Sequence, residues 1–451
     1  MTASSTPAAA PLTLAPRRAR YIDVGASAPS APAGAVSDAE IRLFEQLDLL
    51  YRTTCSVLFN FVPTSGHPGG SISSGRIAQS LLFHSMEYDF ADPDRPDADM
   101  ISYAAGHKAM GLYALWALRN ELVRQGAELM GIGGLLAPEA RQLRLEDLLG
   151  FRRNPTNGLP LFRQYNAKPL DGHPTCATPF IRIATGASGV GVPATLGLAL
   201  GALDVYGPGA PRVHMLEGEG GMTPGRVHEA LAIASATQMA NAFLHVDWNQ
   251  ASIDSNHVCR NNGTPGDYVQ WDPKELCYVH DWNVVYVPEG HNFRQILTAQ
   301  KLALTLGSTQ PTAVVYRTTK GWKYGVEGRA SHGAGHKFCS DGYYASIADC
   351  EKEFAVTFPR PAADASPAAV EQANFDTLMT IRAAMANDNL DAILISGARG
   401  SSEISYLANY LPQSPAWLLF PREGAPVVFI HFFNHQPCAK AQSIVDDVRW
   451  Y

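Results

Sequence analysis

Apolar residues recur along this chain in two periods, which predict helices and strands in alternation. Over residues 37–61 they fall every three or four positions and form one helical stripe: Ile41, Phe44, Leu47 and Tyr51. Ser37 and Glu40 make a capping box at the start of this helix. Farther along, short strand-like runs alternate with helical patterns, in the order 212–217 (strand), 225–240 (helix), 241–248 (strand), 282–287 (strand), 292–306 (helix) and 312–317 (strand).

This alternation predicts an α/β fold with a mostly parallel sheet flanked by helices. Residues 1–36 are rich in Ala, Pro and Ser and lack a continuous apolar run, so we expect a disordered leader. We expect the main domain over 37–345, a linker over 346–373 where Pro and Ala accumulate, and a small α/β domain over 374–451. The elements expected after the linker are a helix at 375–389, a strand at 391–396, a helix at 402–411 and a hairpin at 416–432.

Composition narrows the class of protein. A net charge of -7 and a pI near 6.1 argue against nucleic acid as the main partner. Seven scattered cysteines without a CxxC pair indicate neither a zinc ribbon nor a disulfide framework, and they fit a reducing cytoplasm. The leader lacks the apolar core of a secretory signal, and the most apolar long segment, 190–206, contains three Gly, a Pro and an Asp. It predicts a buried helix and no membrane span.

An acidic, glycine-rich loop is the first candidate for chemistry. In "HMLEGEGG", Glu217 and Glu219 alternate with glycines where a predicted strand meets a helix. Such junctions offer free backbone amides to phosphate groups, and an anion beside Glu219 requires a cation between them. After the next strand, "DWNQASID" adds the amide oxygen of Asn249 and the carbonyl of Ala251. This oxygen set suits magnesium, although a solvated loop explains "GEGG" alone equally well.

Four histidines on glycine-flanked loops favour a site over a solvated loop. They are His67 in "SGHPGG", His107 in "AAGHKAMG", His173 in "DGHPT" and His332 in "RASHGAG". Neutral imidazoles can donate to hydroxyl or phosphate oxygens and can move protons near neutral pH. "TGASGVGVPA" at 185–194 is another Gly/Ser loop at the start of a helix, and so a second candidate cradle.

These motifs, in this order, resemble the thiamine diphosphate-binding half of transketolases over residues 38–345. The resemblance is carried by "SGHPGGSIS", "GHKAMGLYAL", "GHPT…TGASGVG", "GEGGMTPGRVHEA", "DWNQASID" and "TTKGW…EGRASHGAG". The first component of pyruvate dehydrogenase shares the glycine–acid–glycine…Asn signature, but the paired "GHPGG" and "SHGA" motifs favour transketolase. The resemblance implies transfer of a two-carbon ketol unit between sugars, with thiamine diphosphate and Mg²⁺ as cofactors.

The resemblance also implies a role for each motif residue. Mg²⁺ would be held on the diphosphate by Glu219, Asn249 and the Ala251 carbonyl, framed by Gly218 and Gly220. His107 and His332 would contact the diphosphate and the sugar, and His67 and His173 would meet sugar hydroxyls, so that all four are candidate catalytic residues. The remaining wall of the cofactor cleft would be formed by Gly186, Ser188 and Gly189.

Two departures from the family pattern lie in the acidic loop. The family's metal-binding aspartate is Glu219 here, which is one methylene longer. A family glutamate that joins paired active sites aligns with Pro224, which cannot titrate. Of the other acids nearby, we interpret Glu217 as a solvated residue at the strand end and place Glu229 a turn into the following helix.

Nothing after residue 345 resembles the family's pyrimidine-binding half, so we expect a separate chain to supply it, within a homo- or hetero-oligomer. Residues 381–451, with "PREGAP", resemble instead the N-terminal, non-catalytic domain of creatinase and Xaa-Pro aminopeptidase proteins. Two alternatives stay open: a degenerate interaction or regulatory protein, and a thiamine enzyme acting on 2-oxo acids. The donor and acceptor substrates are not determined by these residues.

Overall fold

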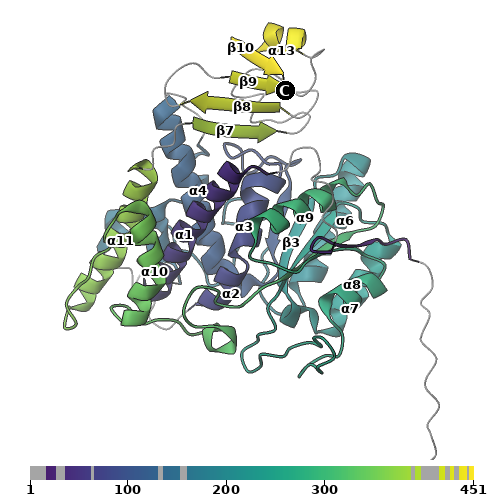
Figure 1. The fold of residues 1–451 in the computed structure, drawn as a ribbon, viewed down its shortest axis with the longest axis horizontal. Helices are drawn as coiled ribbons and strands as arrows, with labels where there is room; N and C mark the ends of the chain where they lie inside the picture. The colour runs from purple at the N-terminus through teal and green to yellow at the C-terminus, as the bar shows by residue number, and fades with distance from the viewer. Residues whose placement is uncertain are drawn as a thin grey trace, which may run out of the picture.

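The fold is that of a computed structural model, which describes residues 17–26, 36–61, 66–130, 136–152, 160–387, 392–397, 416–421, 427–430, 436–443 and 446–450. Within these ranges the strands form a six-stranded sheet and a separate four-stranded sheet (Figure 1). The expected helix at 402–411 lies outside the described residues. Of the helices that are described, none is both long and apolar enough to cross a membrane.

The larger sheet is parallel throughout, as the alternation of strands and helices predicts. Its strand order is β1-β5-β6-β4-β3-β2. The strands are β1 (Tyr21–Asp23), β2 (Met100–Tyr103), β3 (Val213–Gly218), β4 (Ala242–Trp248), β5 (Asn283–Val287) and β6 (Thr312–Arg317). The central strand β4 is buried at all of its seven residues, because helices cover both faces of the sheet.

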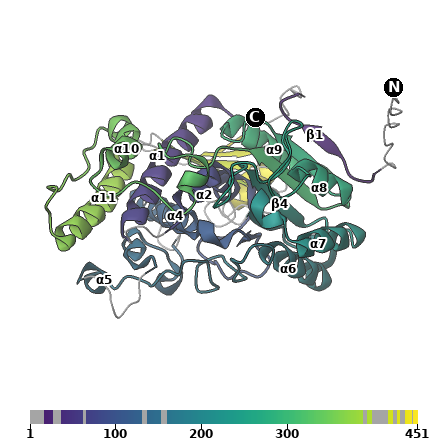
Figure 2. The ribbon, with the colours of Figure 1, turned by 90° about the horizontal axis from the view of Figure 1, so that it is seen from below.

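Two groups of helices cover the two faces, and each builds its own core. One core joins the sheet to α1 (Asp38–Phe61), α3 (Gly75–Ser80), α4 (Ala109–Met130) and α9 (Phe293–Thr305). The other core joins it to α6 (Gly191–Tyr206), α7 (Gly225–Ala236) and α8 (Pro273–Val279). Neighbouring residues of β3 alternate between the cores, since Met215 belongs to the second and Leu216 to the first. In Figure 2, α1 and α4 lie on one side of β4, and α6 and α7 lie on the other.

Several short elements connect this framework. The short α-helices are α2 (Pro68–Ser73) and α5 (Pro160–Gln164). The other short helical turns are η1 (Leu81–Ser85), η2 (Gly106–Lys108), η3 (Glu139–Arg141), η4 (Leu145–Gly150), η6 (Gly207–Gly209), η7 (Glu219–Met222) and η8 (Gly328–Ser331). Of these elements, α2, η2, η7 and η8 contain residues of the glycine-rich motifs, so the motifs form turns near strand ends and helix starts.

Part of the expected disordered leader is ordered, and for residues 17–26 that expectation was wrong. β1 pairs with β5 at the edge of the large sheet, with Tyr21 opposite Val284. Arg18 anchors the segment through an ion pair of 2.7 Å with Asp281. A three-residue strand carries too short a pattern to stand out in an Ala- and Pro-rich segment. Its pairing partner is also more than 260 residues away, so nothing nearby in the sequence marks it. The rest of the leader, 1–16 and 27–35, lies outside the described residues.

The segment expected as a linker, 346–373, is helical at both ends. Its start belongs to α10 (Asp341–Phe354) and its end to α11 (Pro367–Asn387). Both helices pack into the first core, on α1 and on η4 next to α4. Arg382 on α11 makes two hydrogen bonds of 2.7 and 2.8 Å to Glu146 and also reaches Glu121 at 3.2 Å. The main domain therefore continues past residue 345 and includes α11.

The second sheet has the order β10-β9-β8-β7 and mixed directions. It comprises β7 (Ala392–Gly397), β8 (Ala416–Pro421), β9 (Val427–Ile430) and β10 (Asp447–Trp450), with α13 (Gln436–Gln442) between the last two strands. β8 and β9 are antiparallel, as expected for the hairpin at 416–432, and β10 lies parallel to β9. In Figure 1 this sheet is drawn at the top, away from α2 at the bottom.

Candidate cofactor-binding site

Loops at the carboxyl ends of β3, β4 and β6, together with α2 and η2, enclose a cavity of about 270 Å³, here called the cofactor cavity. Open parallel sheets bind their ligands at this end of the strands. Nine of the predicted site residues line it: His107, Gly186, Ser188, Gly218, Glu219, Gly220, Asn249, Ala251 and His332. The remaining three, His67, His173 and Gly189, lie just behind this lining, as the contacts below show.

Glu219 is the one acid among the predicted site residues, and it is buried, with 1% of its surface exposed. One carboxylate oxygen, Oε2, accepts a hydrogen bond of 3.1 Å from the backbone N–H of Asn249. The other, Oε1, is buried and has no hydrogen-bond partner among the described residues. Burial, and next the negative charge of Asp247, raise the pKa of Glu219 to about 7. A buried carboxylate oxygen without a hydrogen-bond partner is available to coordinate a cation.

Asn249 and Ala251 present oxygens to the same cavity. The Asn249 amide is oriented at both ends, because its Nδ2 donates to Asp247 at 3.0 Å and its Oδ1 accepts from the Ala251 N–H at 3.0 Å. The residues thus offer a carboxylate, an amide and a main-chain oxygen. Such hard oxygen donors suit Mg²⁺, so the residues present fit the metal that the resemblance implies.

Asp247 and Lys108 form a buried ion pair under this site that the sequence interpretation missed. Asp247 is fully buried and Lys108 is 2% exposed, and Lys108 Nζ lies 2.7 Å from Asp247 Oδ2. Asp247 also accepts hydrogen bonds from Ser73 on α2 (2.6 Å) and from Thr318 after β6. Burial alone would raise the pKa of Asp247, but the Lys108 charge and the hydrogen bonds from Lys108, Ser73 and Thr318 together outweigh it and hold this pKa below its usual value. Through Asp247, the turn η2, the helix α2 and the loop after β6 are joined to β4 beneath Asn249.

Lys320 is a second missed lysine, and it stands directly at the predicted metal site. Its side chain is buried, and Nζ donates to the Ala251 carbonyl at 3.0 Å and to Nδ1 of His332 at 2.7 Å. Burial lowers the pKa of Lys320 to about 8, against the opposing effect of Glu219. An ammonium can only donate, so Nδ1 of His332 is the acceptor and its proton is on Nε2.

Three of the four predicted histidines form one cluster. Ring centroids are 5.1 Å apart for His67 and His107, 5.0 Å for His67 and His332, and 5.9 Å for His107 and His332. His67 Nδ1 donates to the carbonyl of His332 at 2.6 Å, which leaves Nε2 of His67 as an acceptor. Burial lowers the pKa of all three, to about 4 for His332, so they are neutral at pH 7.

The fourth histidine, His173, lies against the loop that holds Gly186. A Cβ on Gly186 would come within 2.4 Å of the His173 ring, and a Cβ on Gly106 would meet Gly186 at 2.5 Å. Gly189 has φ +76° and lies under Pro224, 2.6 Å from the place of a Cβ. These close approaches explain the glycines of the "TGASG" loop, because any side chain would push the loop away from its neighbours.

The interpretation of Glu217 as a solvated residue was wrong, because its side chain is buried. Its exposure is 2%, and its Oε1 accepts from the Gly218 N–H at 2.8 Å. The carboxylate lies under Gly221, whose Cβ would sit 2.4 Å from Cδ of Glu217. Burial raises the pKa of Glu217 to about 7. The turn η7 folds back over the strand end, which the sequence pattern alone does not predict.

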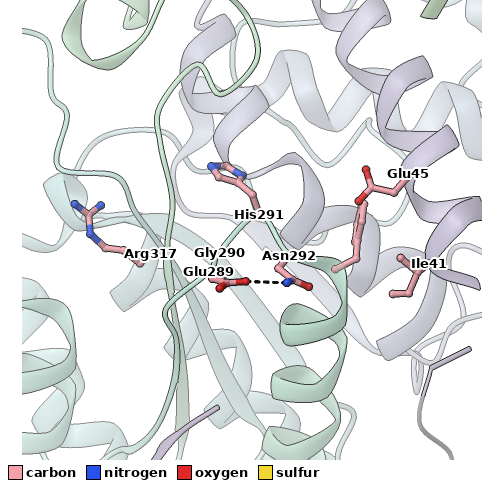
Figure 3. A pocket seen from close by; sticks show the side chains of 8 residues that line it. Ile41, Glu45, Glu289, Gly290, His291, Asn292 and Arg317 are labelled. Atoms are coloured by element: carbon pink, nitrogen blue, oxygen red, sulfur yellow. Dashed lines mark hydrogen bonds between the residues drawn. The ribbon is translucent and has the colours of Figure 1, made fainter. Parts of the chain in front are cut away.

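A second pocket, of about 490 Å³, opens at the carboxyl end of β5 (Figure 3). His291 stacks on Trp322, with ring centroids 4.5 Å apart, and its Nε2 accepts from the Thr319 N–H at 2.8 Å. Figure 3 shows Glu289 joined to Asn292 by a hydrogen bond, with Arg317 across the pocket. None of the candidate site residues lines this pocket, whereas nine of them line the cofactor cavity.

The parallel sheet and the cofactor cavity define an α/β domain whose glycine-rich loops and buried polar residues meet at the carboxyl ends of the strands. Comparison with known proteins shows what this region is similar to. Residues 140–340 match the family model "Transketolase, thiamine diphosphate binding domain". The resemblance inferred from the motifs is thereby confirmed for this part of the chain, whereas the creatinase-like resemblance of the tail stays a prediction.

Curated relatives and solved structures show the same similarity. Human transketolase is 30% identical over 271 residues, which are 60% of this chain and 36% of that protein. Mouse transketolase-like protein 2 is 29% identical over 270 residues, 60% of this chain and 35% of that protein. The chain thus spans about a third of the length of these relatives. Transketolase from Leishmania mexicana superposes with a TM-score of 0.53 at 22% identity, covering 76% of this chain and 46% of that one. The Pichia stipitis enzyme in complex with sedoheptulose-7-phosphate gives 0.53 at 21% identity, with 76% and 45% covered. At these identities, the structures show a shared fold.

Proposed function

We propose that this chain carries the diphosphate-binding half of a transketolase-like enzyme that transfers a two-carbon ketol unit between sugars. The observation that carries the proposal is that Oε1 of Glu219 is buried without a hydrogen-bond partner, in the cavity that Asn249 and Ala251 also line. These three residues would hold Mg²⁺, and Gly218 and Gly220 leave room for the diphosphate beside it. When bound, thiamine diphosphate supplies the nucleophilic carbon that the chemistry requires.

The histidine cluster provides the polar groups that a sugar substrate needs. His332 carries its proton on Nε2, and Nε2 of His67 has none. One ring can therefore donate a hydrogen bond to a substrate hydroxyl and the other can accept one. Because burial keeps both imidazoles neutral, His67 can accept a proton at Nε2 without first losing one, whereas His332 presents its Nε2–H as a hydrogen-bond donor. We propose that His107 and His173 complete the polar wall on the side of η2 and the "TGASG" loop.

The pyrimidine-binding half is proposed to come from a separate chain. In support, the described residues after α11 form a sheet of mixed direction, unlike the parallel sheet that holds the site. Exposed apolar side chains also support an oligomer: Leu200 and Val205 on α6 are 37% and 73% exposed, and Ile233 on α7 is 58% exposed. Because α6 and α7 pack on each other, we propose that these side chains contribute to one oligomer contact.

The test is ketol transfer with the purified chain, Mg²⁺ and thiamine diphosphate, with and without a pyrimidine-domain chain that co-purifies from the native cell. We expect activity from a ketose phosphate donor only when both chains are present. Activity of the chain alone would contradict the separate partner. Use of pyruvate in place of ketose phosphate would favour a 2-oxo acid enzyme, and loss of cofactor binding in every mixture would favour a non-catalytic protein.

A further inference from the structure

Lys320 places an ammonium group on one of the oxygens that would bind the metal. We propose that Lys320 is an internal cation that competes with the divalent metal while the cofactor cavity holds no anion, and that supports metal binding once a diphosphate is present. Cation binding by this chain would therefore depend strongly on the diphosphate. The inference rests on the proposed function, because it uses the same cavity and the same oxygens.

The first observation is the shared oxygen. Lys320 Nζ lies 3.0 Å from the Ala251 carbonyl oxygen, a hydrogen-bond distance that directs the ammonium charge onto that oxygen. A metal ion bound at the same oxygen would lie close to Nζ, and two positive charges at such a distance repel each other strongly in a buried site. Lys320 itself is only 3% exposed, so water does not screen this repulsion.

The second observation is the balance of charge in the cavity. Lys108 is already paired with Asp247 at 2.7 Å, which leaves Lys320 as the buried ammonium that balances Glu219. The electrostatic effect is mutual, since Glu219 raises the pKa of Lys320 and Lys320 lowers that of Glu219. A divalent cation entering alone adds positive charge beside the Lys320 ammonium, and Glu217 is the one other carboxylate among the residues that line the cavity.

A bound diphosphate would reverse the effect of the Lys320 ammonium on metal binding. It brings more negative charge than one divalent cation neutralises, so an ammonium beside the cavity then attracts the metal–diphosphate pair. The hydrogen bond from Lys320 to His332 gives the ammonium a second anchor, so that it can leave the Ala251 carbonyl without becoming an isolated buried charge. One residue would thus disfavour the metal alone and favour the metal with diphosphate.

The experiment measures Mn²⁺ binding to the full chain at pH 7 by the electron paramagnetic resonance signal of free Mn²⁺, with and without inorganic pyrophosphate. Lys320→Met removes the ammonium, and Lys320→Gln removes the charge but keeps a hydrogen-bond donor. Lys323→Met is the matched control, because Lys323 is an exposed lysine on the same loop. Circular dichroism and thermal unfolding select the variants that fold as the parent chain does.

We expect both Lys320 variants to bind Mn²⁺ more tightly than the parent chain without pyrophosphate, and less tightly with it, by about fivefold or more in each direction. Lys323→Met should match the parent chain in both conditions. The inference is overturned if the Lys320 variants match Lys323→Met, or if they lose Mn²⁺ in both conditions as a merely structural role predicts. If no variant and no parent chain binds Mn²⁺ even with pyrophosphate, the proposed function itself fails.

Discussion

Replacing Lys108 with methionine tests the buried ion pair beneath the site. Methionine keeps most of the apolar stem and removes the charge that lies 2.7 Å from Asp247 Oδ2. Asp247 would then be a fully buried carboxylate without a cation. Removing one partner of a buried pair typically costs about 3–5 kcal/mol. Neutral donors, among them Ser73, still reach Asp247, so we expect the lower end, about 3 kcal/mol.

Urea unfolding of Lys108→Met, Asp247→Asn and the double variant measures this cost. The double variant removes both charges and should recover about 2 kcal/mol of the sum of the single losses. The deficit of Lys108→Met should also shrink as the pH is lowered, because Asp247 without its cation can take up a proton. A loss below about 1 kcal/mol in Lys108→Met, or strict additivity in the double variant, would refute the account of this pair.

Three further predictions concern the site and its surroundings. Glu219→Gln should weaken Mg²⁺ binding in the presence of pyrophosphate by about tenfold or more, as measured by calorimetry, because a charge-bearing ligand is lost, whereas Glu229→Gln on the exposed face of α7 should not. Stability should fall as the pH drops below about 6.5, because burial lowers the folded-state pKa of His214 and His245, and the unfolded chain then binds protons that the folded chain does not. Urea unfolding between pH 7.5 and 5.5 should show this slope, and His245→Gln should reduce it by up to about 1.4 kcal/mol per pH unit; an unchanged slope would contradict the assignment. Gly189→Ala should destabilise the chain by about 2–4 kcal/mol, because φ is +76° and Pro224 occupies the space, and a thermal unfolding curve like that of the parent chain would be inconsistent with this geometry.

The order of strands and helices in the main domain was predictable, because long apolar runs such as 241–248 carry a periodic signal. The boundaries were less predictable. β1 is three residues long, and its position depends on Val284, far along the chain. α11 has the composition of a solvent-exposed linker at its start, yet Phe375 and Leu378 bury it against the first core. Contacts distant in sequence leave no local pattern, so periodicity predicted a helix at 375–389 but neither β1, nor the start of α11 at Pro367, nor its packing on the main domain.

Motif residues of the site were predictable, but the charges that balance them were not. Glu219 and Asn249 stand on glycine-rich turns whose spacing carries a signal. Lys108 and Lys320 are single lysines with no spacing to mark them, although Lys108 stands in the apolar run "GHKAMGLYAL", where a lone lysine indicates a buried partner. Asp247 was visible in "DWN", next to the residue that was singled out. Its role depends on burial, which only the fold determines.

Calorimetric titration of the chain with thiamine diphosphate, with and without Mg²⁺, tests the central claim most directly. We predict saturable binding of one cofactor per chain that requires the metal, and loss of that binding in Glu219→Gln with the fold intact by circular dichroism. Inorganic pyrophosphate should compete with the cofactor, because the diphosphate is the part that this chain would hold. Metal-independent binding, or equal binding by Glu219→Gln and the parent chain, would contradict the assignment of the site.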